Sequence, residues 1–246
     1  MSAAPPFRAI PALTETNRRF YDGLWSDAAL VEPARFNTWP LVAALCERAA
    51  RRLEVAPGLR PRLPLQGTAF LDLSAPALRA LRAHGGGAAH GSIGALPFVD
   101  RSFDLVCAFD IVEHVADDDG ALAELARVAA PEATLLLSVP LHPQAWNAFD
   151  ECVGHCRRYE PEALATKLAR HGFAIERSAV YGMQAKSSRL LDLGMWFLQR
   201  HRGMAMRWYN RVFMPIGLRM QKPLHWVDGM IDTRGVDEVL LVCRRR

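Results

Sequence analysis

The stretch ALPFVDRSFDLVCAFDIVEHV, residues 95–115, contains a strong strand signal, because positions 103–110 are nearly all apolar. A strand has this pattern when helices cover both faces of its sheet. The acidic run Asp117–Asp119 follows and caps GALAELARVA (120–129), whose leucines recur at helical spacing. The apolar segment TLLLSVP (134–140) comes next. This order predicts a right-handed unit of two parallel strands joined by a helix.

The same alternation extends in both directions from this unit. Further strands are expected at 52–56, 68–73, 87–93, 173–181 and 237–244. Helices are expected after Pro40, after the capping residue Ser74 and after Pro161. Strands alternating with helices of about ten residues predict an α/β fold with a doubly wound, mostly parallel, seven-stranded sheet. The final strand could be an antiparallel strand at the edge of this sheet.

The chain divides into four expected regions. Residues 1–39 form a proline-containing arm and a lid helix near 16–25, and residues 40–182 form the core. Residues 183–230 are rich in Met, Trp and Arg, and interrupt the alternation. Two helices, separated near Gly203 and ended at Pro215, are expected in this insert. Residues 231–246 supply the final strand of the core sheet.

The bulk composition limits the class of protein. The chain has 246 residues, half of them hydrophobic, and a formal net charge of +4, so a packed core is expected. The basic bias is too weak to indicate nucleic acid as a partner. Five scattered cysteines, no secretory signal and no long apolar span favour a cytoplasmic location.

Candidate site residues follow from the strand order. Ligands of an open parallel sheet bind beyond the carboxyl ends of its strands, near the point where strand order reverses. We therefore single out the residues that follow each expected strand. They are Glu54 to Arg60 after the first, Asp72 to Ser74 after the second, Ser92 and Ile93 after the third, Phe109 to His114 after the fourth, and Pro140 to His142 after the fifth.

The pattern of residues 95–115, followed by a helix and TLLLSVP, resembles the class I S-adenosylmethionine (SAM)-dependent methyltransferases of the type 11-like group. The likeness runs from about residue 50 to 182, and the preceding FYDGLW helix (20–25) is also common in this family. It implies a Rossmann-like fold and SAM as cofactor. DECVGHCRRYEPEAL (150–164) is similar to a stretch in a subset of these enzymes, several of which act on lipid, quinone or glycan substrates.

The resemblance assigns cofactor-binding roles to eleven residues. Asp72 would accept the ribose hydroxyls, as carboxylates at this position do in dinucleotide folds, or it would only favour the next helix. Leu73 and Ile93 would flank the adenine, and Ser92 stands where the family has an acid that binds the adenine amino group. The methionine end would lie beside Phe109, Asp110 and His114. Glu54, Ala56, Gly58 and Arg60 match the acid and the three glycines of the family's first turn.

This first turn departs from the family's pattern. Only Gly58 is retained of the glycines, and Pro61 and Pro64 restrict the helix that normally follows. Asp72 comes 14 positions after Gly58, where a longer helix would give about 20. We predict that the first helix is lost. The guanidinium of Arg60 or Arg62 would then replace part of the helix N-terminal field at the cofactor carboxylate.

Methyl transfer depends mainly on positioning, but an oxygen or nitrogen acceptor can require removal of a proton. His142, His155 and Tyr159 are the catalytic candidates, although for each residue alone a structural role has more weight than a catalytic one. Asp150, Arg157 and Arg158 are further polar candidates in the same segment. Cys152, His155 and Cys156 have no second pair of ligands at metal-binding spacing, so no metal site is expected.

Three interpretations of the insert remain open. It could be a helical cap, a lid over a hydrophobic acceptor, or an amphipathic contact with an anionic membrane through residues 186–222. The sequence as a whole predicts a SAM-dependent methyltransferase acting on an O or N atom of a small or lipid-like acceptor. The alternative is a catalytically silent relative that acts as a binding partner or scaffold.

Overall fold

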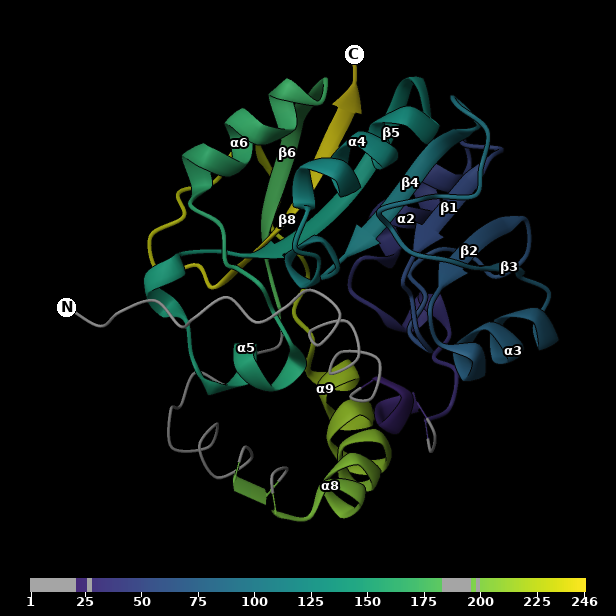
Figure 1. The fold of residues 1–246 in the computed structure, drawn as a ribbon, viewed down its shortest axis with the longest axis vertical. Helices are drawn as coiled ribbons and strands as arrows, with labels where there is room; N and C mark the ends of the chain where they lie inside the picture. Colours follow the sequence, from purple (N-terminus) through teal and green to yellow (C-terminus); the bar gives the residue numbers. More distant parts are fainter. Residues whose placement is uncertain (1–20, 26–27, 183–195, 198–199) are drawn as a thin grey trace.

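The computed structural model describes residues 21–25, 28–182, 196–197 and 200–246. Its central feature is an eight-stranded sheet in the order β3-β2-β1-β4-β5-β8-β6-β7 (Figure 1). The α/β class and the mostly parallel sheet are thus confirmed, and the eighth strand, β7 (Val227–Asp228), is a two-residue addition beside β6. The strand order reverses between β1 and β4, which makes their carboxyl ends the expected ligand site.

The parallel part of the sheet follows the apolar runs of the sequence. Its strands are β1 (Arg52–Val55), β2 (Thr68–Asp72), β3 (Gly87–His90), β4 (Phe103–Phe109) and β5 (Ala129–Pro140). Each pairs in parallel with its neighbour in the sheet. β6 (Phe173–Tyr181) completes the set of strands that were expected within the core.

The last strand was placed wrongly at an edge. β8 (Glu238–Arg245) is antiparallel, as expected, but it lies between β5 and β6 and pairs with both. Its run from Val239 to Cys243 is fully buried, because helices cover both faces of the sheet there. A continuous apolar run indicates a strand buried on both faces, so the sequence did contain the signal for an interior position.

Helices cover both faces of the sheet. α4 (Asp118–Val128) and α6 (Pro161–Arg170) pack on one face, where Val106 and Leu135 point, and α2 (Trp39–Cys46) packs on the other with Leu136. The neighbouring residues Leu135 and Leu136 thus point to opposite faces of the sheet, as successive side chains of a β-strand do. α3 (Ala75–Ala83) begins at Ser74, whose side chain accepts a hydrogen bond from the Ala77 N–H, as expected for its N-cap.

The chain between β1 and β2 contains no helix. Residues 56–67 form turns only, so the predicted loss of the first helix is confirmed. Pro57, Pro61 and Pro64 remove three backbone donors from this segment, and a helix interior needs such donors. The loop instead turns back over the end of β1.

The C-terminal insert approaches the ends of the strands. α8 (Arg202–Trp208), the π-helical stretch η4 (Tyr209–Phe213) and α9 (Met214–Met220) form one helical rod, grouped with α5 (Ala148–Val153) below the sheet in Figure 1. The expected break near Gly203 lies at His201. The expected end at Pro215 is wrong, because the π-helical stretch accommodates the missing proline N–H and the helix continues to Met220. Within the described ranges, no helix is long and apolar enough to cross a membrane.

Candidate functional site

A cavity of about 240 Å³ opens at the carboxyl ends of β1, β2 and β4 and beside the turn after β3. It lies at the point where the strand order reverses. All eleven residues expected to bind a cofactor line it: Glu54, Ala56, Gly58, Arg60, Asp72, Leu73, Ser92, Ile93, Phe109, Asp110 and His114. Residues separated by up to 60 positions therefore meet in one place because each follows a strand of the same sheet.

Asp72 ends β2 with a carboxylate that is 7% exposed. Oδ2 accepts a hydrogen bond from the Gly58 N–H at 2.8 Å, and Oδ1 accepts one from the Ser74 N–H at 2.7 Å. Burial raises the pKa of Asp72, and these N–H groups oppose that rise. A carboxylate has about four acceptor sites, so Asp72 can still accept hydrogen bonds from a diol in the cavity.

Gly58 sits under the indole of Trp25, which belongs to the helical residues 21–25. Gly58 has a φ of +56°, and a Cβ at this position would overlap the Trp25 ring. Only glycine satisfies both conditions. The Gly58 N–H is bonded to Asp72, so the turn does not present this N–H to the cavity.

Glu54 is a buried acid beneath the loop that replaces the first helix. Its carboxylate accepts hydrogen bonds from the Arg62 N–H at 2.8 Å and from the Leu63 N–H at 2.9 Å. These bonds fix the loop on β1. Burial raises the pKa of Glu54 to about 7, although the two N–H groups and the Arg62 charge act in the opposite direction.

This raised pKa predicts a measurable dependence of stability on pH. The folded chain binds a proton at Glu54 more strongly than the unfolded chain, whose glutamate titrates near 4.5, so stability is lost as the pH rises from about 4.5 to 7. Glu54→Gln cannot ionise. Its free energy of unfolding relative to wild type should therefore increase by on the order of 2–3 kcal/mol between pH 4.5 and pH 8. Urea unfolding at several pH values measures this, and parallel pH curves for the two proteins would refute it.

Two arginines anchor the same loop to other elements. The Arg60 guanidinium lies 5.0 Å from the ring centres of both Trp25 and Tyr209 and bonds to Asn210 Oδ1. Arg60 therefore lines the cavity and also connects it to η4. Arg62 stacks on Phe36 and donates two hydrogen bonds to the Tyr181 hydroxyl, on β6.

The side of the cavity formed by β2 and β3 is mainly apolar. Ile93 is buried, and Leu73 is 40% exposed. Ser92, which is exposed, accepts a weak hydrogen bond from the Gly94 N–H. A flat aromatic group could lie between the two aliphatic side chains, with one hydroxyl beside it.

The end of β4 places a carboxylate at the opposite wall. Asp110 has a φ of +49°, a left-handed conformation that aspartate tolerates better than most residues. Its backbone N–H bonds to Ser138 on β5, and the Ser138 hydroxyl donates to Asp110 Oδ1 at 2.6 Å. Phe109 lies next to it, against Tyr181.

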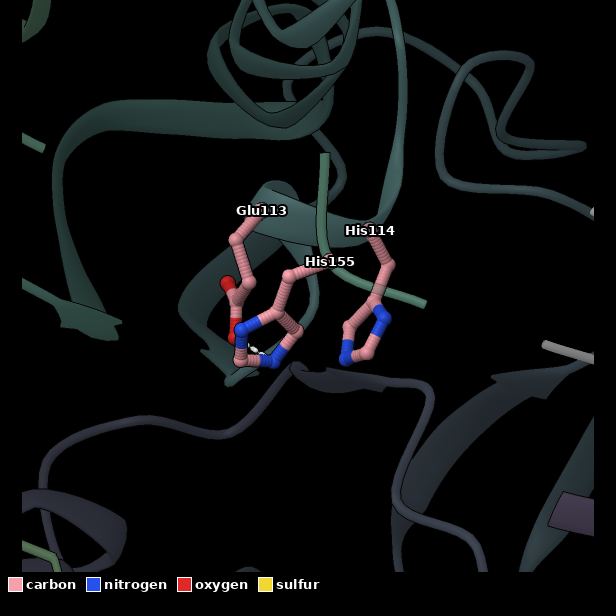
Figure 2. Close-up of side chains that lie close together, drawn as sticks. All are labelled: Glu113, His114 and His155. Atoms are coloured by element: carbon pink, nitrogen blue, oxygen red, sulfur yellow. Dashed lines mark ion pairs between the residues drawn. The ribbon is translucent and has the colours of Figure 1, made fainter. Parts of the chain in front are cut away.

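The short helix η2 (Val112–His114) follows directly and carries Glu113 and His114. His155, from the turn after α5, reaches the same point: its Nε2 is 3.8 Å from Glu113 Oε1, and its ring lies 4.6 Å from that of His114 (Figure 2). His114 faces the cavity, and burial lowers its pKa to about 3, so its imidazole is neutral. Burial also raises the pKa of Glu113 well above its ordinary value.

A buried network holds His155 in place. His155 Nδ1 is 2.7 Å from Asp150 Oδ1, and the Arg158 Nε–H donates to both oxygens of the same carboxylate. Arg158 Nη1 bonds to Asp237 at 2.6 Å. Burial would raise the pKa of Asp150, but the bonds from His155 and Arg158 outweigh it and hold the pKa below its ordinary value.

The three expected catalytic residues do not lie together. None of the three is among the residues that line the cavity, but the His155 ring contacts that of His114, which does line it. His142 Nε2 bonds to the Thr233 carbonyl, and the Tyr159 hydroxyl donates to Asp118. Tyr159 is 5% exposed and packs in the core. Both residues have structural hydrogen bonds at a distance from the cavity wall.

Sequence reasoning missed several members of the site. Tyr21, Asp22 and Trp25 line the cavity from the N-terminal helix, whereas Arg62, which also lines it, was named beside Arg60 from the sequence. The expected lid helix at 16–25 includes Tyr21, Asp22 and Trp25, but nothing in the sequence indicated which aromatic ring would cover Gly58. Residues 16–20 of that helix lie outside the described residues.

Comparison with known proteins shows a likeness to methyltransferases over part of the chain. A family model described as a methyltransferase domain matches residues 59–137. A curated protein of Mycolicibacterium smegmatis, named "Probable S-adenosylmethionine-dependent methyltransferase", is 30% identical over 89 residues. This match covers 35% of each chain, so the present chain spans about a third of the length of that relative.

Solved structures share the fold over most of the chain. A SAM-dependent methyltransferase of Thermotoga maritima, described as a possible histamine N-methyltransferase, has a TM-score of 0.55 at 13% identity and covers 96% of this chain and 94% of its own. The [4+2]-cyclase SpnF has a TM-score of 0.53 at 18% identity, with 84% and 80% covered. Such likenesses show the fold alone, and SpnF illustrates that one fold hosts different chemistry. The methyltransferase-domain match and the curated relative show that part of this chain is similar to SAM-dependent methyltransferases, and the solved structures show that the fold is shared with such enzymes.

Proposed function

We propose that this protein is an enzyme that binds SAM in the cavity at the ends of β1, β2 and β4 and methylates an O or N atom of a small or lipid-like acceptor. The observation that carries the proposal is the convergence of all eleven expected cofactor-binding residues on this cavity. These assignments were made from strand ends and family resemblance, and a wrong register or a wrong strand order would have scattered them.

The groups around the cavity have the chemistry that SAM requires. Asp72 offers acceptor sites to the ribose hydroxyls, and Leu73 and Ile93 offer apolar surface to the adenine. Arg60 supplies the positive charge that a carboxylate tail needs, since the Gly58 N–H is used by Asp72. Bound SAM would supply an electrophilic methyl group. The donor set therefore fits the cofactor in spite of the altered turn.

The protein's own contribution is to position the acceptor and receive its proton. His155 is the proposed base among the three catalytic candidates, because its ring contacts that of His114, which lines the cavity. Its Nδ1 is held by Asp150, which directs Nε2 toward Glu113 and His114. A carboxylate on one imidazole nitrogen increases the basicity of the other. The neutral His114 can accept a hydrogen bond from the acceptor and orient it.

Calorimetry with SAM and S-adenosylhomocysteine tests the proposal. We expect both ligands to bind in the micromolar range, because product and donor share the ribose, adenine and tail contacts. No heat of binding at millimolar ligand would reject the proposal and favour a catalytically silent protein that acts as a partner or scaffold.

Replacement of Arg60 tests its role at the cofactor tail. Arg60→Ala should raise the SAM dissociation constant by about 10–100-fold, because one charge-assisted hydrogen bond contributes about 1.5–3 kcal/mol. Arg79→Ala is the matched control, since Arg79 is exposed on α3 and outside the cavity. Tyr209→Ala removes one of the two rings beside the Arg60 guanidinium but keeps the charge of Arg60, so it separates the effect of the charge from that of the ring. If Arg60→Ala binds SAM as tightly as the control, Arg60 has no role at the tail.

An apolar cluster beside the cavity supports a lipid-like acceptor. It is formed by buried side chains of the N-terminal helix, the loop after β1, α3, α5 and α8, with Phe149 and Cys152 packed against them: Leu24, Trp25, Leu59, Ala77, Val153 and Met206. Met and aromatic side chains adapt to irregular apolar ligands. The acceptor would enter between these elements and the His114 wall.

The outer face of α8, η4 and α9 supports a peripheral contact with an anionic membrane. Trp208, Phe213 and Met220 are 51%, 60% and 74% exposed, and exposed arginines at 207, 211 and 219 are interleaved with them. Aromatic and basic side chains on one helix are typical of interfacial binding. We expect co-sedimentation with anionic vesicles that weakens with salt and is lost in a Trp208→Ser, Phe213→Ser variant. Equal binding to neutral vesicles or none to either would reject this contact.

A further inference from the structure

We propose that Glu113, His114 and His155 form a binding site for one divalent transition-metal ion, such as Zn²⁺ or Co²⁺, at the wall of the cavity. Each residue offers one ligand atom, and the three atoms lie within 4.8 Å of one another. Figure 2 shows the three side chains gathered at one point. This inference concerns metal binding alone and does not rest on the proposed methyl transfer.

The first argument is the state of Glu113. The side chain is 0% exposed, and neither carboxylate oxygen has a hydrogen-bond partner in the described part of the chain. His155 Nε2 lies 3.8 Å from Glu113 Oε1, which is beyond hydrogen-bond distance. A buried carboxylate without partners is rare in folded proteins, and a bound cation is one of the standard explanations.

The second argument is the orientation of the two imidazoles. His155 Nδ1 is 2.7 Å from Asp150 Oδ1, and His114 Nδ1 is 3.3 Å from the Gly154 carbonyl. These acceptors favour a proton on Nδ1 of each ring, so Nε2 is the nitrogen of each ring that would bind a metal. Carboxylate or carbonyl partners on the far nitrogen are the usual outer shell of metal-bound histidines.

The backbone already holds the two turns that carry the ligands. The Cys156 N–H donates to the Glu113 carbonyl at 2.7 Å, and the His155 N–H donates to the Asp150 carbonyl at 2.8 Å. Arg157 bonds to the carbonyls of Val115 and Ala116. Ligand atoms around a tetrahedral ion are about 3.4 Å apart. Side-chain rotations that move the three ligand atoms by about 1 Å would therefore bring them to this spacing.

The donor set and its position indicate the kind of metal and its use. Two imidazoles and one carboxylate suit Zn²⁺, Co²⁺, Mn²⁺ or Fe²⁺, and three protein ligands leave a position open for a further ligand. His114 lines the cavity, so that open position would face it. The Tyr21 hydroxyl lies 3.3 Å from His114 Nε2 and would have to move or become the fourth ligand. An acceptor oxygen bound to the ion would lose its proton more easily.

Cobalt titration of the full-length protein, after treatment with a chelator, tests the site. We expect one Co²⁺ per chain, visible absorption bands of an N/O-coordinated ion, and displacement by one equivalent of Zn²⁺. Glu113→Gln, His114→Asn and His155→Gln should each weaken binding by about 100-fold or more, since loss of outer-shell partners alone weakens metal affinity 10–100-fold.

Cys152→Ser and Cys156→Ser are the matched controls, because both cysteines are near His155 in the sequence but outside the proposed set. They should bind Co²⁺ like wild type, and circular dichroism establishes that every variant is folded. The wild-type spectrum needs no variant and decides the matter if the ligand variants fail to fold. No stoichiometric Co²⁺ or Zn²⁺ uptake, or uptake that depends on the cysteines, would overturn the proposal and leave His155 free to act as a base.

Discussion

Asp72→Asn should weaken SAM binding by more than about 100-fold. The ribose diol of SAM can donate two hydrogen bonds to the Asp72 carboxylate, and each bond to a charged group contributes about 1.5–3 kcal/mol. The asparagine keeps one oxygen, which can still accept from the Gly58 or Ser74 N–H, so the loop and the helix cap are affected less than the ligand. Calorimetry with S-adenosylhomocysteine gives the dissociation constants of both proteins.

A deoxyribose analogue of S-adenosylhomocysteine separates ribose recognition from a general effect on the loop. In wild type the analogue should bind much more weakly than the natural compound, whereas Asp72→Asn should bind the two almost equally. Arg79→Ala changes an exposed residue of α3 outside the cavity and serves as the control. If Asp72→Asn still distinguishes the two compounds as wild type does, Asp72 does not contact the ribose.

The cavity could be predicted because its residues follow strands. A buried strand has a continuous apolar run, and the end of that run locates the next residue at the ligand edge of the sheet. Asp72 and Asp110 were found in this way from local sequence alone. The loss of the first helix was equally local, since Pro61 and Pro64 exclude it whatever lies nearby.

Contacts between distant segments could not be predicted in this way. Trp25 covers Gly58, and His155 meets Glu113, only because separate elements pack at the same edge. No periodicity relates such pairs. The two errors in the fold have the same origin: the interior position of β8 depends on β5 and β6 as neighbours, and Pro215 lies within a helix because a π-helical stretch precedes it.

The second large effect is expected at the buried arginine that supports His155. Arg158→Met should destabilise the fold by about 3–5 kcal/mol, the range measured when one member of a buried ion pair is removed. The Arg158 side chain is 0% exposed and is bonded to Asp150 and to Asp237. Methionine fills similar space but leaves the Asp150 carboxylate, also 0% exposed, without its main positive partner.

Two further variants show whether the lost charge pairing or the lost packing is responsible. Arg170→Met removes an arginine whose side chain is 66% exposed and whose nearest acidic oxygen is 3.9 Å away, so it should change stability by less than about 0.5 kcal/mol. Asp150→Asn combined with Arg158→Met removes the uncompensated charge and should recover part of the loss. Only the ionised form of the Asp150 carboxylate is costly to bury without a partner. The loss in free energy of unfolding caused by Arg158→Met should therefore be larger at pH 8 than at pH 5, as measured by urea unfolding. A defect of equal size at both pH values, unchanged in the double variant, would assign it to packing alone.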